Sequence, residues 1–442
     1  MSEVIAASAG QRRDFVVVST AQFSMAFALN FVLVFLPFYI HTISPLDDAA
    51  TLRWTGLIVG AAPAMAAFGS TFWGGLTDRF SPKTLFERGM LSHAILVTLM
   101  GFTTDLRLLL LIRIVQGFMG GISTIGLIIV AAISTEKELP RRMGVYQSAL
   151  TLGQIFAPPL GAMAAAAFNF RGAFLASGLM LFGVWVFAHL ALSRIPRQPQ
   201  RSAAEAIPRR QIWLAWLVSL VGTMHIVFLP SILPTILRGF EIPEPRQLVT
   251  AGFIVFAYGT AAAAGSYGFS RLAGRIPTGR LILAASLGAA LSQVFLYLGS
   301  GPVTFTLIRM AQTGCAAGIF PLILAQIATK SQGKTIGLIN TARFAGNALG
   351  PIVATFILSQ SSLLTLYVVL GAGLALAAAG NYLGTPAGGK SAEAGCSKRP
   401  ICGVGLLGHS LRRTWSTPHS APGTHPKDGC AALHLDLFEQ PG

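Results

Sequence analysis

The most regular feature of this sequence is a series of long apolar segments separated by short polar connections. A helix that crosses the hydrocarbon core of a bilayer needs about 20 apolar residues, because its backbone groups must be hydrogen-bonded within the helix. Twelve segments meet this requirement, so we predict an all-α membrane protein with 12 transmembrane helices. They cover residues 15–40, 54–76, 84–103, 107–132, 143–166, 170–193, 212–237, 248–272, 279–299, 303–328, 334–358 and 362–384.

The positions of Lys and Arg predict the orientation of these helices. Basic residues near the ends of membrane helices are retained on the cytoplasmic side. The connections on one side, counted with residues 1–14, hold 18 Lys and Arg residues, whereas those on the other side hold 5. We therefore expect both termini to be cytoplasmic. The net charge of +16 does not indicate a nucleic-acid partner, because the basic residues lie in short clusters between apolar segments.

The two halves of the predicted bundle resemble each other at an offset of 193 to 196 residues. Such a parallel duplication of six helices favours a transporter that works by alternating access between pseudo-symmetric halves. The matching positions are Phe72, Leu76 and Arg79 with Phe269, Leu272 and Arg275; Arg113 and Gln116 with Arg309 and Gln312; and Gly144, Gly153 and Pro158 with Gly337, Gly346 and Pro351. The predicted organisation is an N-terminal segment at 1–14, a first half at 15–193, a linker at 194–211, a second half at 212–384 and a disordered tail at 385–442.

The connection after the second predicted helix carries charged residues that we interpret as a conformational latch. A carboxylate and basic groups at a helix end can bind a neighbouring helix, or its dipole, and release it as the halves move. The alternative is a solvated helix end that only anchors the topology. The candidate latch residues are Gly74, Asp78, Arg79 and Lys83.

Three of the predicted helices carry further candidate residues. Arg113 lies about 9 Å inside the fourth helix, so its side chain either faces a cavity or a partner, or extends to the outer interface. The fifth and eleventh helices contain glycines that permit close helix packing and prolines that bend the backbone, in a functional motif or as generic packing residues. These residues are Gly153, Pro158 and Gly161 in the fifth helix and Gly346, Gly350 and Pro351 in the eleventh.

These segments resemble the signature sequences of the major facilitator superfamily, G-x-L-x-D-R-x-G-R-K, L-x-x-x-R-x-x-Q-G and G-x-x-x-G-P-x-x-G-G. The departures are Ser81 and Pro82 in the first motif and Ala157 and Ala162 in the third. The resemblance covers residues 15–384 and is greatest with bacterial twelve-span drug:proton antiporters. It implies the major facilitator fold, a multi-pass position in the cell inner membrane, and a coupling role for the arginine of the second motif. The third motif implies export rather than import.

The predicted membrane helices contain arginines but no acidic residue well inside them. Proton-coupled export of cationic drugs usually relies on a buried Asp or Glu whose pKa is shifted. Because three arginines have no evident counter-ion, we hypothesise a cavity that favours neutral or anionic amphipathic molecules. His225 is a candidate for the coupling proton, or a hydrogen-bonded core residue. The candidate cavity and coupling residues are Asn30, Arg113, Gln116, His225, Arg309 and Arg343.

The preferred function is secondary active transport, with proton-coupled efflux of a drug, a metabolite or a siderophore. An importer or symporter of an organic anion or nutrient, and a non-transporting membrane sensor, are the alternatives. We expect no enzyme activity, cofactor or metal, because no nucleotide-binding loop, metal-ligand pair or nucleophile elbow is found. The Cys and His residues of the tail match no compact zinc pattern. The expected partners are a small-molecule substrate, the proton and the lipid bilayer, and we expect a monomer.

Overall fold

The computed structural model describes residues 2–135, 138–193, 209–273, 275–328 and 334–384. The predicted tail at 385–442 and most of the predicted linker at 194–211 lie outside these residues. The chain divides into two units, residues 1–386 and 387–442, and the description below concerns the first. Its described residues form α-helices and short 3-10 helices and include no strand, which confirms the all-α prediction.

The described helices account for the twelve predicted crossings of the membrane. Ten segments of the described chain are helices long and apolar enough to cross. One of them counts twice, because helix α6 (Leu139–Ala191) breaks at Asn169, where the backbone φ is 59°. Helix α3 (Pro82–Met100) lies between two of the ten and has 19 residues, which is enough for a further crossing.

The fourth predicted helix is divided in two at Gly121. The backbone φ of Gly121 is 91°, in the left-handed region that glycine adopts without strain. The break separates helices α4 and α5 within one crossing of the membrane. Besides α3 and α6, the elements of the first half are α1 (Ser2–Ile43), α2 (Asp48–Gly75), η1 (Leu76–Asp78), α4 (Leu106–Phe118) and α5 (Ile122–Ala132).

The seventh predicted helix is also divided, at Phe228. Pro230 follows two residues later, and a proline interrupts a helix because it has no N–H and its ring clashes with the preceding turn. The elements of the second half are α7 (Arg209–Val227), α8 (Leu229–Gly239), α9 (Glu244–Leu272), α10 (Thr278–Phe295), η2 (Leu296–Leu298), α11 (Pro302–Ala328), α12 (Lys334–Gln360) and α13 (Leu363–Gly384).

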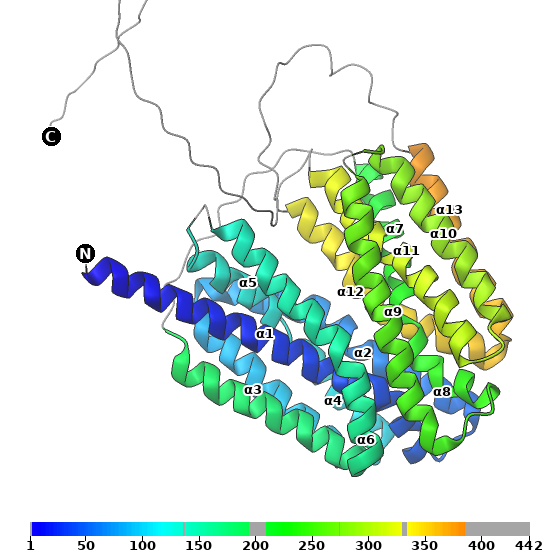
Figure 1. Ribbon diagram of the computed structural model, residues 1–442. Coiled ribbons are helices and arrows are strands. Elements are labelled where there is room, and N and C mark those ends of the chain that lie inside the picture. Colours follow the sequence, from blue (N-terminus) through cyan, green and yellow to red (C-terminus); the bar gives the residue numbers. More distant parts are fainter. Residues whose placement is uncertain (1, 136–137, 194–208, 274, 329–333, 385–442) are drawn as a thin grey trace, which may run out of the picture. The chain divides into compact units, whose positions relative to one another are not determined.

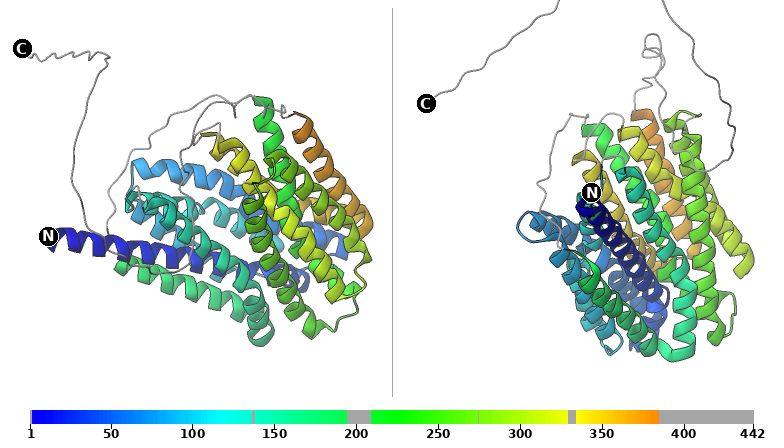
Figure 2. Two further views of the ribbon diagram at one scale, coloured as in Figure 1. Left: turned by 45° about the horizontal axis from the view of Figure 1, so that its top comes forward. Right: turned by 60° about the vertical axis from the view of Figure 1, so that its left-hand side comes forward.

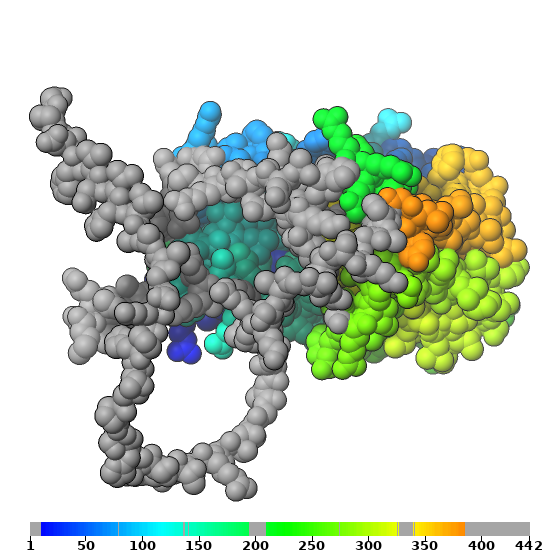
Figure 3. All heavy atoms as spheres, turned by 90° about the horizontal axis from the view of Figure 1, so that it is seen from above, coloured from blue at the N-terminus to red at the C-terminus, as the bar shows by residue number. Residues whose placement is uncertain are grey.

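The helices of the two halves form two groups that lie side by side (Figure 1 and Figure 2). Helix α2 of the first half packs along α12 of the second, and α6 packs along α9. Seen from above, the first half lies to one side in blue to teal and the second to the other in green to orange (Figure 3). We call the end at which α1 begins and α13 ends the termini end, and the opposite end the far end.

Candidate functional site

Arg113 occupies a break in the backbone hydrogen bonding of helix α2. Pro63 lies within α2 and has no N–H, so the carbonyl four residues earlier, that of Val59, loses its helical partner. Arg113 reaches this carbonyl from α4: its Nη2 donates to Val59 O at 3.1 Å, and its Nε donates to Ile58 O at 3.0 Å. Its Nη1 donates to Gln116 Oε1 at 2.7 Å. The buried guanidinium therefore replaces the missing N–H.

Arg309 does the same at the break between α7 and α8. Pro230 has no N–H, so the carbonyl of Ile226, four residues earlier, lacks its helical donor. From α11, Arg309 donates through Nη2 to Ile226 O at 2.7 Å and through Nη1 to His225 O at 2.8 Å. The same Nη1 also donates to Gln312 Oε1 at 2.5 Å. Arg309 is fully buried, and its charge is bound by carbonyl dipoles instead of a carboxylate.

The two arginines occupy matching positions of the repeat, yet the carbonyls that they bind belong to crossings that do not match. Arg113 binds a carbonyl of the second crossing, whereas Arg309 binds one of the seventh. The Cζ of Arg309 also lies 4.7 Å from the ring centroids of both Phe228 and Tyr258, a favourable cation–π geometry. Both arginines thus have polar partners inside the bundle, which the sequence alone did not reveal. Their predicted contact with a transport cavity stays a prediction.

Arg343, the third arginine of the predicted cavity, has a different environment. It lies on α12 and is partly exposed, and its Cζ is 4.7 Å from the ring centroid of Phe320 on α11. Among the described residues, no hydrogen bond or ion pair to its guanidinium is found. Its N–H donors are therefore not bound to helix carbonyls in the way that those of Arg113 and Arg309 are.

His225 and Asn30 each form a hydrogen bond with a carbonyl one turn earlier on the same helix. His225 is fully buried, and its Nδ1 lies 2.9 Å from Val221 O, which places the proton of a neutral ring on Nδ1. Its Nε2 is buried and has no hydrogen-bond partner within the described part of the chain. Asn30 is partly exposed, and its Nδ2 donates to Ala26 O at 2.8 Å. Their predicted roles in coupling or in the cavity stay predictions.

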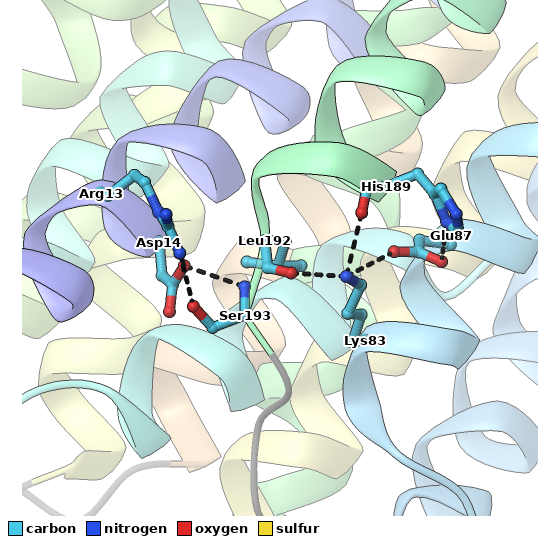
Figure 4. A network of polar contacts seen from close by, with 7 residues as sticks. All are labelled: Arg13, Asp14, Lys83, Glu87, His189, Leu192 and Ser193. Atoms are coloured by element: carbon cyan, nitrogen blue, oxygen red, sulfur yellow. Dashed lines mark hydrogen bonds and ion pairs between the residues drawn. The ribbon is translucent and has the colours of Figure 1, made fainter.

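The predicted latch residue Lys83 binds the end of helix α6 in its own half (Figure 4). Its Nζ donates to Leu192 O at 2.5 Å and to His189 O at 3.0 Å. A cation at this position satisfies terminal carbonyls and interacts favourably with the helix dipole. Glu87 completes the group, because its Oε1 lies 3.5 Å from Lys83 Nζ and its Oε2 lies 3.1 Å from His189 Nδ1.

A second contact at the same end of α6 involves helix α1 (Figure 4). Asp14, which is 5% exposed, accepts a hydrogen bond from Ser193 N at 3.0 Å. Arg13 Nη2 donates to Ser193 Oγ at 2.8 Å. Helices α1 and α3 therefore both bind the C-terminal end of α6, and all of these contacts lie within the first half.

The other latch residues make fewer contacts. Arg79 is exposed and follows η1, and the carbonyl of Gly74 accepts a hydrogen bond from Thr77 Oγ1 at 2.6 Å. The side chain of Asp78 lies outside the described part of the structure. The opening and closing of a latch by these residues therefore stays a prediction.

Sequence reasoning did not identify Glu87, which is mostly buried beside Lys83. A signal was available, since the two residues are four positions apart and opposite charges at this spacing meet on one face of a helix. The contact of Glu87 with His189 had no such signal, because those residues are 102 positions apart.

The motif glycines let the fifth crossing lie close to the first, and the eleventh crossing lie close to the seventh. A β-carbon at Gly153 of α6 would lie 2.5 Å from Phe23 O on α1, and one at Gly346 of α12 would lie 2.6 Å from Leu220 O on α7. Any larger residue would therefore force the helices apart. The four motif glycines in such contacts are Gly153 and Gly161 against α1, and Gly346 and Gly350 against α7.

The prolines of the same motifs lie at the interface between the halves. A β-carbon at Gly252 of α9 would lie 3.0 Å from Pro158 O on α6, and one at Gly56 of α2 would lie 2.9 Å from Pro351 O on α12. Gly56 and Gly252 are 196 residues apart, which is the offset of the repeat. Sequence reasoning missed both glycines, although this offset could have identified them. Both lie in the part of their helix that is nearer the far end.

Of the ion pairs found among the described residues, one joins the two halves. Arg238 Nη1 lies 3.4 Å from Asp48 Oδ2 at the far end. Both side chains are exposed, and an exposed pair of this kind contributes only about 0–1 kcal/mol. Nearer the middle of the crossings, Phe156 of the first half packs against Phe256 of the second, with ring centroids 5.9 Å apart. Close packing is therefore the main contact between the halves at this end.

Comparison with known proteins identifies the family. The sequence profile of the Major Facilitator Superfamily matches residues 18–351, which is more than half of the chain. The chain is 25% identical over 370 residues to an uncharacterized MFS-type transporter, YuxJ, of Bacillus subtilis, and this match covers 79% of the chain and 92% of that protein. It is 23% identical over 356 residues to the multidrug resistance protein MdtG of a Rahnella species, with coverage of 77% and 86%.

A solved structure supports the same fold. A bacterial homologue of the human lysosomal transporter Spinster, in an inward-facing and unoccupied conformation, aligns with a TM-score of 0.68 at 14% identity. The alignment covers 85% of this chain and 96% of that one. The chain therefore belongs to the major facilitator superfamily, as a multi-pass membrane transporter of small molecules and not an enzyme.

Proposed function

We propose that this transporter exports small amphipathic molecules in exchange for protons, by alternating access between its two halves. Relatives that include the multidrug resistance protein MdtG support export. The motif of the fifth crossing, which resembles that of exporters, supports the same direction. Drugs, metabolites and siderophores all fall within this class of substrate.

The interface between the halves is the observation on which this proposal rests. At the far end, Gly56 and Gly252 pack against the carbonyls of Pro351 and Pro158, and the ion pair there is exposed. Separating such surfaces leaves no buried charge behind, so the halves can part at low cost. Alternating access requires an interface with this property.

The proposed orientation follows from the distribution of charge. Lys and Arg residues are in excess at the termini end, so we place this end in the cytoplasm and the far end in the periplasm. Because the close contacts between the halves lie nearer the far end, the arrangement corresponds to an inward-facing state in the bacterial inner membrane. One chain contains both halves, so a monomer suffices for the cycle.

We assign roles in the cycle by geometry. Arg113 and Arg309, with Gln116, hold the proline breaks of α2 and α7 in place while the halves move. His225 carries the coupling proton, because it is a buried titratable side chain beside the second of these breaks. The segment 74–83 closes the termini end when the far end opens.

Membrane vesicles test the direction of transport. Inverted vesicles that contain the full chain are energised by respiration, which acidifies their interior, and are offered cationic, neutral and anionic fluorescent dyes. An exporter accumulates at least one dye, and nigericin, which collapses the pH gradient in the presence of potassium, releases it. Accumulation only in right-side-out vesicles would instead indicate an importer. A complete absence of flux in both kinds of vesicle would indicate a sensor.

A further inference from the structure

Arg343 differs from the other two arginines of the predicted cavity, because no partner for its N–H donors is found among the described residues. It lies nine residues after Lys334, the first residue of α12, or about 14 Å along the helix. Of its surroundings, the structure shows the ring of Phe320 at 4.7 Å. A guanidinium has five N–H donors, and leaving them without partners inside a membrane protein is expensive. Within the part of the chain that the structure describes, these donors are left to water or to an anion.

The described acidic side chains do not supply this partner. Each of them lies near an end of a membrane crossing, and none is paired with Arg343. The described acids are Asp14, Asp47, Asp48, Glu87, Asp105, Glu138, Glu241 and Glu244. The helix interior around Arg343 therefore carries positive charge, which attracts anions and repels cations.

The position of Arg343 along α12 places it beyond the close contact between the halves. Gly60 of α2 packs against the carbonyl of Ala348 on α12. Arg343 lies five residues from Ala348 toward the termini end, which is the end that the proposed inward-facing state leaves open. A solute that enters from this end can therefore reach the guanidinium.

We propose that Arg343 and Phe320 form a binding site for a carboxylate joined to an aromatic body. The planar guanidinium binds a carboxylate through two parallel hydrogen bonds, and the partly exposed ring of Phe320 packs against the apolar part of the ligand. The phosphate of a lipid headgroup has related chemistry. In the predicted crossing 334–358, Arg343 lies nine residues from the cytoplasmic end, and this expected depth favours a solute over a headgroup. This site rests on the proposed transport function, because it is the substrate site of that cycle.

A binding measurement tests the site without any gradient. The full-length protein in detergent is titrated with 1-naphthylacetate and with 1-naphthylacetamide, which share a ring system and differ in charge, and the dissociation constants are measured by calorimetry. We expect wild-type protein to bind the carboxylate at least tenfold more tightly than the amide. Arg343→Gln should abolish this preference, and Arg343→Lys should retain part of it. The exposed Arg53→Gln on α2 is the matched control and should leave the preference unchanged.

Equal binding of the two probes by wild-type protein would overturn the proposal, and so would an unchanged preference in Arg343→Gln. A third result would assign the site to lipid and also overturn the proposal. In it, phosphatidylglycerol stabilises the protein more than phosphatidylcholine does, this difference depends on Arg343, and naphthylacetate does not bind. Failure of every dye to move in vesicles, combined with Arg343-dependent binding, would reject the proposed transport direction and not this site.

Discussion

Arg113 and Val59 are joined by a hydrogen bond that replaces one removed by Pro63. The Nη2 of Arg113 lies 3.1 Å from Val59 O, although the two residues are 54 positions apart. The planar guanidinium offers several donors in a fixed geometry, so one side chain serves two neighbouring carbonyls. Arg309 repeats the arrangement at Ile226. In this conformation each arginine stabilises a neighbouring helix at the turn where a proline removes a backbone hydrogen bond.

Replacing Arg113 with Ala is expected to lower the free energy of unfolding by about 3 kcal/mol, because the buried carbonyl of Val59 is left without a donor and that of Ile58 loses a second one. The loss should be smaller in a Pro63→Ala background, where the N–H of the new residue can donate to the carbonyl of Val59. A double-mutant cycle in mixed micelles measures the difference. Arg107→Ala, which removes an exposed side chain at the start of the same helix, is the control. The same loss in both backgrounds would contradict the proposed link to Pro63.

Enlarging Gly252 should hold the far end open. We expect Gly252→Leu to reduce transport at least tenfold, because its side chain would overlap with Pro158 and Ala162 of the other half. Gly252→Ala should have a smaller effect of the same sign. Gly268 lies on the same helix, and the position of an added β-carbon there is open space. The transport rate of Gly268→Leu should therefore stay near that of wild type. Equal rates for the two leucine variants would show that closure at Gly252 is not needed.

Lys83 is expected to stabilise the first half by capping α6. Lys83→Met should lower the free energy of unfolding by about 1 kcal/mol, since the carbonyls of His189 and Leu192 lose a cationic donor. Lys83→Arg should retain most of the stability. Arg280, an exposed residue near the start of α10 in the second half, supplies the control Arg280→Met. Unchanged stability together with lost transport would show that Lys83 acts only as a latch.

His225→Gln should separate proton coupling from substrate movement. Accumulation driven by an imposed pH gradient should be lost, because the side chain can no longer accept a proton, whereas exchange of labelled for unlabelled substrate at equal pH should persist. His93→Gln is the matched control, since His93 is also buried and bonded to a carbonyl four residues earlier. If gradient-driven accumulation survives in His225→Gln, another group carries the proton.

The crossings were predictable because each is a long apolar run, and this signal does not depend on how the helices pack. Local breaks were harder to predict. The break at Asn169 falls between the separate helices that the sequence predicted at 143–166 and 170–193. Gly121, by contrast, divides a segment that was predicted as a single helix.

The partners of the site residues were not predictable from the sequence. The carbonyl that loses its helical donor at Pro63 can be located by counting four residues back. Which side chain donates to it instead depends on how α4 lies against α2. The same holds for Lys83, whose acceptor at Leu192 is 109 positions away. Such contacts are set by packing between helices, and no local pattern encodes them.

Distances between spin labels show whether the two ends of the transporter open in alternation. One pair of labels, at Leu46 and Arg246, spans the far end, and a second pair, at Thr84 and Arg280, spans the termini end, in a variant whose four natural cysteines are replaced. We predict that lowering the pH or adding substrate lengthens the far-end distance as the termini-end distance shortens. Distances that stay fixed, or that change in the same direction at both ends, would contradict alternating access.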